Sequence, residues 1–187
     1  MINLETKKVI RKQLLKKRSN LSEYERKQFE KEIFYKVIKL EEYQKAKNIL
    51  LYANYGTEVS TEPLLEYSHQ QGKRIFYPKV LSDTKMEFLE VLKVQDLKEG
   101  FKGISEPIEG RCFSEIDCGF MILPMVGFDN KKNRLGYGKG YYDRYLGKNY
   151  NILTCGIAFA CQEYTPCLPT DINDYRLDMI VTEKIIY

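Results

Sequence analysis

The sequence predicts an α/β protein: a single three-layer domain over residues 1–187, with a mostly parallel central sheet covered by helices on both faces. Two observations predict this class. Apolar runs of strand length alternate with segments of helical periodicity along the chain. Several of these runs are apolar throughout, which is typical of strands whose two faces are both covered. A length of 187 residues without repeats or a low-complexity linker favours one domain.

Two helices are predicted at the start of the chain. Residues 4–18 lack Gly and Pro, and they place Ile10, Leu14 and Leu15 on one side at helical spacing. Ser22 followed by Glu25 is a capping box, which predicts the start of a second helix. The helical pattern then continues to about residue 43.

The remaining elements alternate between strand and helix. Apolar runs predict strands at residues 48–54, 74–80, 86–91, 120–126, 152–159 and 178–182. Helical patterns that end at a glycine predict helices at residues 61–71 and 141–146. Residues 93–111 are rich in glycine and are predicted to form a long connection or flap. In such sheets ligands bind beyond the carboxyl ends of the strands, so we expect the site there.

Composition narrows the chemistry. With 43% hydrophobic and 30% charged residues, the chain is expected to fold and to stay in solution. No two of the five cysteines form a C-x-x-C pair, so reduced thiols are expected. The charged N-terminus and the lack of a long apolar run predict a cytoplasmic protein without a membrane segment. His69 is the only histidine, so catalysis by Lys, Arg, carboxylates and backbone amides is expected.

The most unusual feature is a glycine loop, residues 134–142, which follows a fully apolar strand and leads into a helix. Alternating glycines leave backbone N–H groups accessible, and Arg134 and Lys139 add positive charge, which together suit a polyphosphate. The glycine spacing matches neither a Walker A loop nor the G-x-G-x-x-G fingerprint. A glycine-rich turn with an incidental lysine is the alternative.

The first predicted helix carries cations on its apolar side. Lys7, Arg11 and Arg18 lie within about 40° of one another around the helix axis. One interpretation is that Lys7 and Arg11, one turn apart, point at a phosphate held by the glycine loop. The alternative is that their stems cover the core while their charged ends reach water.

Three carboxylates fall near strand or helix ends: Glu58, Asp143 and Asp178. Mg²⁺ is commonly held by one or two carboxylates together with phosphate oxygens. Asp143 could instead complement the dipole of the helix that it starts. Asp178 could equally form a salt bridge with Arg176.

Residues 134–143, Arg-Leu-Gly-Tyr-Gly-Lys-Gly-Tyr-Tyr-Asp, resemble the most specific motif of the 5-formyltetrahydrofolate cyclo-ligase family. The similarity runs nearly from end to end. It includes the Lys7-x-x-x-Arg11 helix, the turn that begins at Glu58, the segment 123–129 and Leu177-Asp178. At Tyr137, the family's motif often has Arg.

The resemblance implies an ATP- and Mg²⁺-dependent enzyme that converts 5-formyltetrahydrofolate to 5,10-methenyltetrahydrofolate and releases ADP and phosphate. In the implied mechanism the formyl oxygen is phosphorylated and N10 closes the ring. This chemistry needs two aligned reactants and stabilised phosphoryl charge, which cations and backbone amides can supply. The implied partners are these small molecules, with no nucleic acid and no membrane, and the protein is expected to be a monomer.

The resemblance also implies roles for particular residues. Lys7, Arg11 and Lys139 are the expected catalytic cations. The expected ATP-binding residues are Lys7, Lys8, Arg11, Arg134, Leu135, Gly136, Tyr137, Gly138, Lys139, Gly140, Tyr141 and Tyr142. The expected folate-binding residues are Glu58, Tyr137, Lys139 and Tyr141, with further walls from Tyr77-Pro78 and from residues 86–88. The expected Mg²⁺ ligands are Asp143 and Asp178.

Two other functions stay open on the residues alone. A sugar-phosphate isomerase or CoA-transferase-like protein could use a similar scaffold, and it would need no ATP. An RNA-binding module would explain the basic helix and the tyrosines, and it would show a steep dependence of affinity on salt.

Overall fold

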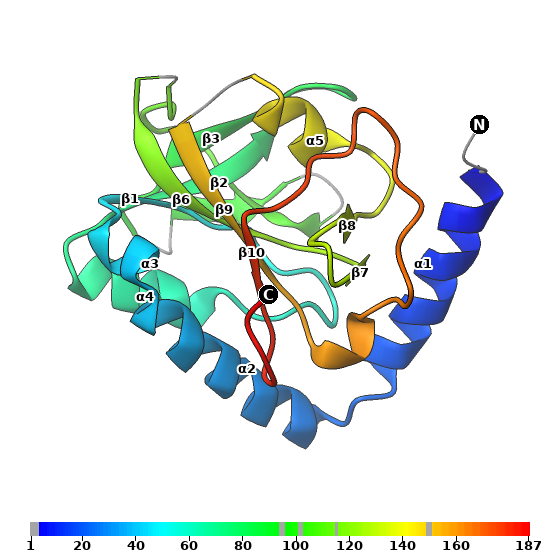
Figure 1. Cartoon of the computed structure of the whole chain (residues 1–187). Coiled ribbons are helices and arrows are strands. Elements are labelled where there is room, and N and C mark those ends of the chain that lie inside the picture. Colours follow the sequence, from blue (N-terminus) through cyan, green and yellow to red (C-terminus); the bar gives the residue numbers. More distant parts are fainter. Residues whose placement is uncertain (1–3, 94–95, 101–102, 115, 149–150) are drawn as a thin grey trace.

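The fold is built around a six-stranded sheet (Figure 1). The computed structural model describes residues 4–93, 96–100, 103–114, 116–148 and 151–187. In order across the sheet the strands are β10 (Met179–Val181), β9 (Asn151–Ile157), β6 (Cys118–Leu123), β1 (Asn48–Leu50), β2 (Arg74–Val80) and β3 (Met86–Glu90). Every neighbouring pair is parallel except β2 and β3. The prediction of a mostly parallel sheet is confirmed.

Helices cover both faces of this sheet. Figure 1 shows α2 (Glu23–Lys39), α3 (Glu41–Lys45) and α4 (Glu62–Gln70) on one face and α5 (Tyr141–Leu146) on the other. Successive residues of a strand point to opposite faces. In β6, Phe120 packs in the cluster that contains residues of α2 to α4, whereas Met121 packs in the cluster that contains residues of α5. The predicted three-layer α/β class is therefore confirmed.

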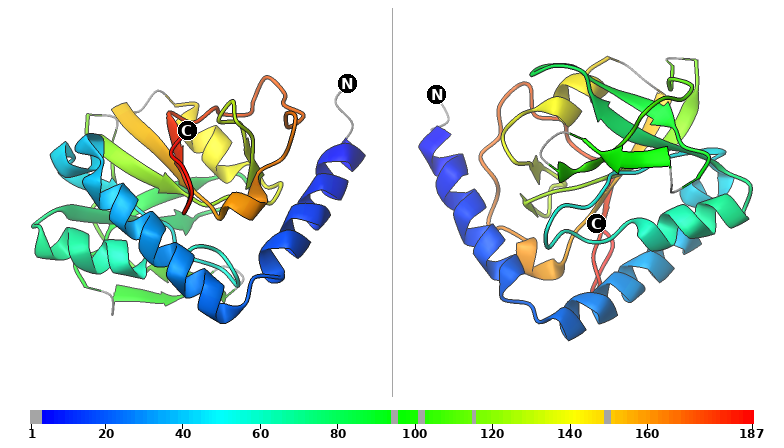
Figure 2. Two further views of the ribbon diagram at one scale, coloured as in Figure 1. Left: turned by 60° about the horizontal axis from the view of Figure 1, so that its bottom comes forward. Right: turned by 180° about the vertical axis from the view of Figure 1, so that it is seen from behind.

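The first helix, α1 (Leu4–Ser19), stands apart from the helices that cover the sheet (Figure 2). Its apolar side packs through Ile10 and Leu14 onto a third cluster that includes Val126 and Leu135. Leu14 comes so close to Gly127 that a Cβ added there would lie 2.1 Å from its Cδ1. No helix among the described residues is both long and apolar enough to cross a membrane.

The second helix begins as predicted and ends earlier. Glu25 N donates to Ser22 Oγ over 3.2 Å, and Ser22 N donates to Glu25 Oε2 over 2.8 Å, so the capping box is present. Leu40 has extended backbone angles and separates α2 from α3. The prediction of one helix to residue 43 was wrong at this point. The side chain of Leu40 packs against the core, and this contact is not visible in the helical periodicity.

Several strands are shorter than predicted because the chain leaves the sheet while it is still apolar. The predicted strands 48–54 and 120–126 end at Leu50 and Leu123. Four short strands were not predicted: β4 (Leu97–Glu99), β5 (Ser105–Pro107), β7 (Gly127–Phe128) and β8 (Arg134–Leu135). β4 and β5 form a hairpin within the predicted connection 93–111. Residues 94–95 and 101–102 of that connection lie outside the described residues.

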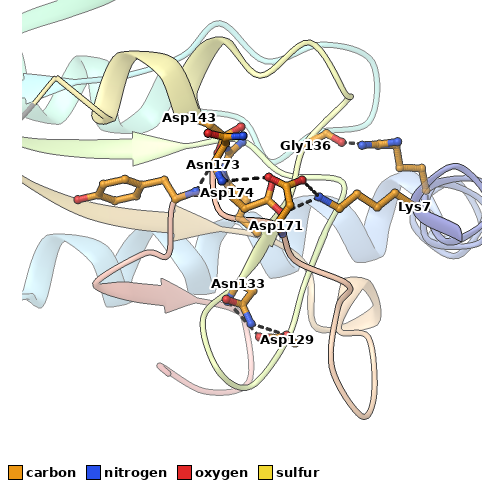
Figure 3. A network of polar contacts seen from close by, with 11 residues as sticks. Lys7, Asp129, Asn133, Gly136, Asp143, Asp171, Asn173 and Asp174 are labelled. Atoms are coloured by element: carbon orange, nitrogen blue, oxygen red, sulfur yellow. Dashed lines mark hydrogen bonds and ion pairs between the residues drawn. The ribbon is translucent and has the colours of Figure 1, made fainter. Parts of the chain in front are cut away.

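Asp129 holds the β7–β8 hairpin in place. Its fully buried carboxylate accepts hydrogen bonds from Lys131 N, from Asn133 N and Nδ2, and from Leu168 N, at 2.9–3.0 Å (Figure 3). These contacts tie the start of the glycine loop to a segment that follows it by more than thirty residues.

We expect Asp129→Asn to lower the free energy of unfolding by about 2–4 kcal/mol. An amide offers one acceptor oxygen, and its NH₂ group would face donors that now bind the carboxylate. Urea denaturation measures the loss, and Asp83→Asn, a change in the exposed turn between β2 and β3, is the control. Equal stability of the two variants would contradict a structural role for Asp129.

Candidate functional site

A pocket of about 440 Å³ lies at the carboxyl ends of the central strands. Tyr52 follows β1, Pro124 follows β6, and Val80 ends β2; all three line the pocket. The glycine loop closes another side. The site therefore lies at the edge of the sheet where parallel α/β folds bind ligands, as expected.

The pocket gathers most of the residues that the sequence singled out. Helix α1 contributes Lys7 and Arg11, and the loop after β1 contributes Glu58. The segment from β8 into α5 contributes the whole glycine loop and Asp143. Two expected residues do not line it: Lys8, which is exposed on α1, and Asp178. Of the expected folate walls, Pro78 and Met86 line the pocket.

Lys7 is held by two aspartates. Its Nζ lies 2.9 Å from Asp171 Oδ2 and 2.5 Å from Asp174 Oδ2, and its side chain is only 9% exposed (Figure 3). Burial alone would lower the pKa of Lys7, but the hydrogen bonds and charges of Asp174 and Asp171 outweigh it and raise that pKa. Neither aspartate is indicated by a motif or spacing in the sequence. A buried lysine on an apolar stripe requires an opposite charge, but its spacing does not say which residues supply it.

Arg11 contacts the glycine loop directly. Its Nε donates to the carbonyl oxygen of Gly136 over 2.7 Å. Its guanidinium carbon lies 3.4 Å from the position that a Cβ on Gly138 would take. One helical turn therefore directs Lys7 to the segment 171–174 and Arg11 to the glycine loop, so α1 joins two walls of the pocket.

The glycine loop depends on backbone conformations that favour glycine. Gly138 has φ 96° and Gly140 has φ 64°. Arg144 holds the loop: its Nη2 donates to Lys139 O over 2.8 Å, and its Nε donates to Thr84 O over 2.9 Å. The side chain of Lys139 is exposed at the pocket and has no partner among the described residues. It is therefore available to an anionic ligand.

Asp143 is the ion-pair partner of Arg134. Its Oδ1 lies 2.7 Å from Arg134 Nη2 and accepts from Tyr175 N over 3.3 Å. The Arg134 side chain is 4% exposed, and its Nε has no hydrogen-bond partner in the described part of the chain. Within the described residues, no hydrogen bond occupies Asp143 Oδ2, so one carboxylate oxygen is available to a cation.

Asp178 is placed differently. Its Oδ2 accepts from Thr154 N over 2.8 Å and from Thr154 Oγ1 over 2.6 Å, and Asp178 does not line this pocket. The alternative ion pair with Arg176 is not formed between these two described residues. No group of three or more His, Cys, Asp or Glu side chains among the described residues could hold a metal ion. A Mg²⁺ ion at the pocket would therefore need ligand oxygens besides the protein's own.

Glu58 is a buried acid at the pocket wall. It is 6% exposed, and its Oε2 accepts from Tyr55 N over 2.8 Å. Burial raises the pKa of Glu58, while the hydrogen bonds from Tyr55 N and Tyr137 and the charge of Arg18 partly oppose the rise. The pKa of Tyr137 is raised to about 12, first by burial and then by the charge of Glu58.

Other parts of the pocket lining are more apolar, and the sequence pattern did not indicate most of them. Ile104 and Glu106 line the pocket from the β4–β5 hairpin, whose strands were too short to give a periodic signal. Tyr52 and Ala53 were assigned to a strand, and their position directly after β1 could have indicated the site. The pocket thus combines a cationic, glycine-rich side with apolar surface.

The fold and this pocket define an α/β protein with a cationic, glycine-rich pocket beyond the carboxyl edge of its sheet, the place where such folds bind ligands. The model of the family described as the 5-formyltetrahydrofolate cyclo-ligase family matches residues 3–183. The chain belongs to this family of ligases, and the resemblance seen in the glycine loop is confirmed.

Individual relatives of known family support this membership. A 5-formyltetrahydrofolate cyclo-ligase of Haemophilus influenzae is 33% identical, with 96% of this chain and 100% of that protein covered. The structure of a 5,10-methenyltetrahydrofolate synthetase of Aquifex aeolicus superimposes with a TM-score of 0.85 at 37% identity, covering 96% of this chain and 91% of that one. A 5,10-methenyltetrahydrofolate synthetase of Mycoplasma pneumoniae gives a TM-score of 0.77 at 33% identity, covering 95% and 99%.

Proposed function

We propose that this pocket converts 5-formyltetrahydrofolate to 5,10-methenyltetrahydrofolate with ATP as co-substrate. One observation carries the proposal: Lys7, Arg11 and the glycine loop line the same pocket as Glu58. The first three suit a polyphosphate, and the fourth suits a ring with N–H donors. The membership of the chain in the cyclo-ligase family supports this reaction.

The two substrates occupy different sides of the pocket in this proposal. The phosphates of ATP lie along the glycine loop, near Arg11 and Lys139. The pterin lies between Glu58 and the apolar wall that includes Met86. A pterin carries an N–H and an amino group side by side, and a carboxylate can accept from both. In this proposal the partners are the two small-molecule substrates, and the protein acts as a monomer.

The proposed reaction has two bond-forming steps. The formyl oxygen attacks the γ-phosphorus of ATP, and ADP leaves. N10 then attacks the activated formyl carbon and loses its proton as inorganic phosphate departs with the former formyl oxygen. The protein aligns the reactants, and Arg11, Lys7 and Lys139 stabilise the charge of the transferring phosphoryl group. No histidine is needed for either step.

Mg²⁺ fits the Asp143 side of this pocket. Asp143 keeps one carboxylate oxygen available within the described residues, and phosphate oxygens would complete the shell. When bound, the ion neutralises charge on the phosphates. Asp178 stays a proposed second ligand, although Thr154 already donates two hydrogen bonds to it.

We expect Asp143→Asn to raise the Mg²⁺ concentration needed for half-maximal turnover by about tenfold or more. Asp178→Asn is expected to raise it less, because that carboxylate lies outside the pocket lining. Binding of 5-formyltetrahydrofolate, measured by calorimetry without ATP, should stay nearly unchanged in both variants. Full activity of both at low Mg²⁺ would show that the two aspartates are structural acids.

The activity itself has a direct test. Purified protein with 5-formyltetrahydrofolate, ATP and Mg²⁺ should form the methenyl product, which is followed by its near-ultraviolet absorbance, with one ADP per ring closed. Replacing ATP by ADP should stop the reaction. Absence of product with folded protein would contradict the proposal. A reaction of a sugar phosphate without ATP would favour the isomerase alternative, and RNA binding that weakens steeply with salt would favour the RNA-binding alternative.

A further inference from the structure

Arg18 is a buried arginine at the end of α1 that does not line the pocket. It is 3% exposed. Its Nε donates to Thr57 Oγ1 over 3.0 Å, its Nη1 to Met125 O over 3.3 Å and its Nη2 to Tyr137 Oη over 2.9 Å. These partners belong to the loop of Glu58, the segment after β6 and the glycine loop. One side chain therefore connects three segments around the site without lining the pocket itself.

Tyr137 lies between Arg18 and Glu58. Its hydroxyl accepts the hydrogen bond from Arg18 and is also hydrogen-bonded to the Glu58 carboxylate. Glu58 itself is buried and is fixed from its own loop by Tyr55 N. The order guanidinium, hydroxyl, carboxylate is a chain of polar contacts that ends inside the pocket.

Arg18 is also the cation that acts on Glu58. The titratable groups that face Glu58 from the packed elements are Arg18 of α1, Tyr52 after β1, Tyr137 of the glycine loop and Tyr142 of α5. The tyrosines are uncharged near neutral pH, since their pKa values are all raised, first by burial. Among the described residues, Arg18 thus supplies the positive charge that favours the ionised carboxylate.

We propose that Arg18 is a positioning residue for pterin recognition, which through Tyr137 keeps Glu58 ionised and aimed into the pocket. The inference rests on the proposed function, because it assigns the carboxylate to the N–H donors of the pterin. A protonated Glu58 would offer one fewer acceptor and would present a donor to the pterin's own donors. A neutral side chain in place of Arg18 could fill the space but could not hold the charge.

The competing explanation is that Arg18 has a purely structural role and only holds the three segments together. Both explanations predict a loss of stability when Arg18 is removed, since three acceptors would lose their donor. They differ in the pH dependence of folate binding. If Arg18 holds the charge of Glu58, its removal raises the pKa of that carboxyl further. When the pH is lowered, the variant then loses folate binding at a higher pH than the wild type does. A purely structural role predicts the same loss of folate affinity at every pH.

The experiment measures the dissociation constant of 5-formyltetrahydrofolate by calorimetry between about pH 5.5 and 9, without ATP. Wild type, Arg18→Met and Lys17→Met are compared. Lys17 is the matched control, because it is an exposed cation of the same helix that has the same charge. The acid limb of the binding curve is the pH range in which affinity for 5-formyltetrahydrofolate falls as the pH is lowered. We expect Arg18→Met to move this acid limb upward by about one pH unit or more, and Lys17→Met to leave it in place.

Two further variants keep the test decisive if Arg18→Met does not fold. Tyr137→Phe removes the hydroxyl between the two charges and leaves the Arg18 contacts with Thr57 and Met125. It should also move the acid limb upward. Arg18→Lys keeps the charge and should leave the limb closer to that of wild type than Arg18→Met does.

The outcomes separate the two proposals. Wild-type protein that binds no 5-formyltetrahydrofolate would overturn the proposed function. Wild-type binding with unshifted limbs in the Arg18→Met and Tyr137→Phe variants would overturn the role of Arg18 alone. An equal weakening of folate binding at every pH would show that Arg18 has a purely structural role. An upward shift in the variants, absent from Lys17→Met, supports the inference.

Discussion

Replacement of Arg11 or Lys7 by alanine is expected to slow turnover by on the order of 100-fold or more, with a smaller effect on folate affinity. Cations that face a transferring phosphoryl group act mainly on the transition state, because negative charge is redistributed there. A 100-fold loss corresponds to about 2.7 kcal/mol of barrier. Steady-state turnover at saturating substrates, together with calorimetric folate binding, measures both quantities.

The two variants should differ in a second respect. Arg11→Ala frees the carbonyl of Gly136, so the glycine loop loses a hydrogen bond of 2.7 Å. Lys7→Ala leaves Asp171 and Asp174 without their cation beside the expected phosphates, so it should weaken ATP binding more. Lys12→Ala, an exposed lysine on the same helix, is the control. Wild-type turnover in both variants would keep the proposed reaction and remove α1 from it.

Substitution of alanine for Gly138 or Gly140 is expected to weaken ATP binding by about tenfold or more. The two glycines have φ of 96° and 64°, which an L residue adopts only with strain of about 1–2 kcal/mol. Relief of that strain would turn the backbone N–H groups of the loop away from the phosphates. Calorimetry with a non-hydrolysable ATP analogue and Mg²⁺ measures the loss.

Gly72→Ala is a matched control for this prediction. Gly72 follows α4, has φ 68° and has no atom within 4 Å of an added Cβ. The Gly72→Ala change therefore introduces a similar backbone strain outside the pocket lining. All three variants should lose stability in thermal denaturation, but only the two in the loop should lose ATP affinity. Unchanged affinity in folded Gly138→Ala and Gly140→Ala protein would show that the loop does not hold phosphate.

Local sequence patterns were sufficient for most of the fold. The capping box at Ser22, the strand Arg74–Val80 and the helix Tyr141–Leu146 agree with the structure because each depends on neighbouring residues. Apolar periodicity also assigned the layers correctly. It failed at the strand ends near Tyr52 and Pro124, because residues that line a pocket are as apolar as residues inside a sheet.

The sequence by itself also determined the backbone conformation of the glycine loop. Gly138 and Gly140 need backbone angles that only glycine adopts readily, so the loop is encoded locally. The family follows from the same motif, and the family model confirms it. The roles expected for Lys139 and Asp143 stay predictions, although both residues line the pocket.

Only the tertiary structure decided which distant residues meet. Lys7 pairs with Asp171 and Asp174 across more than 160 positions, and Arg18 reaches Tyr137 across 119. The same packing of α1 leaves Lys8 exposed and outside the pocket lining. A helical pattern states which side of α1 is apolar, but not against which loops that side packs. Those contacts depend on the packing of Leu14 against Gly127, and a buried charge then takes the partner that this packing brings within reach.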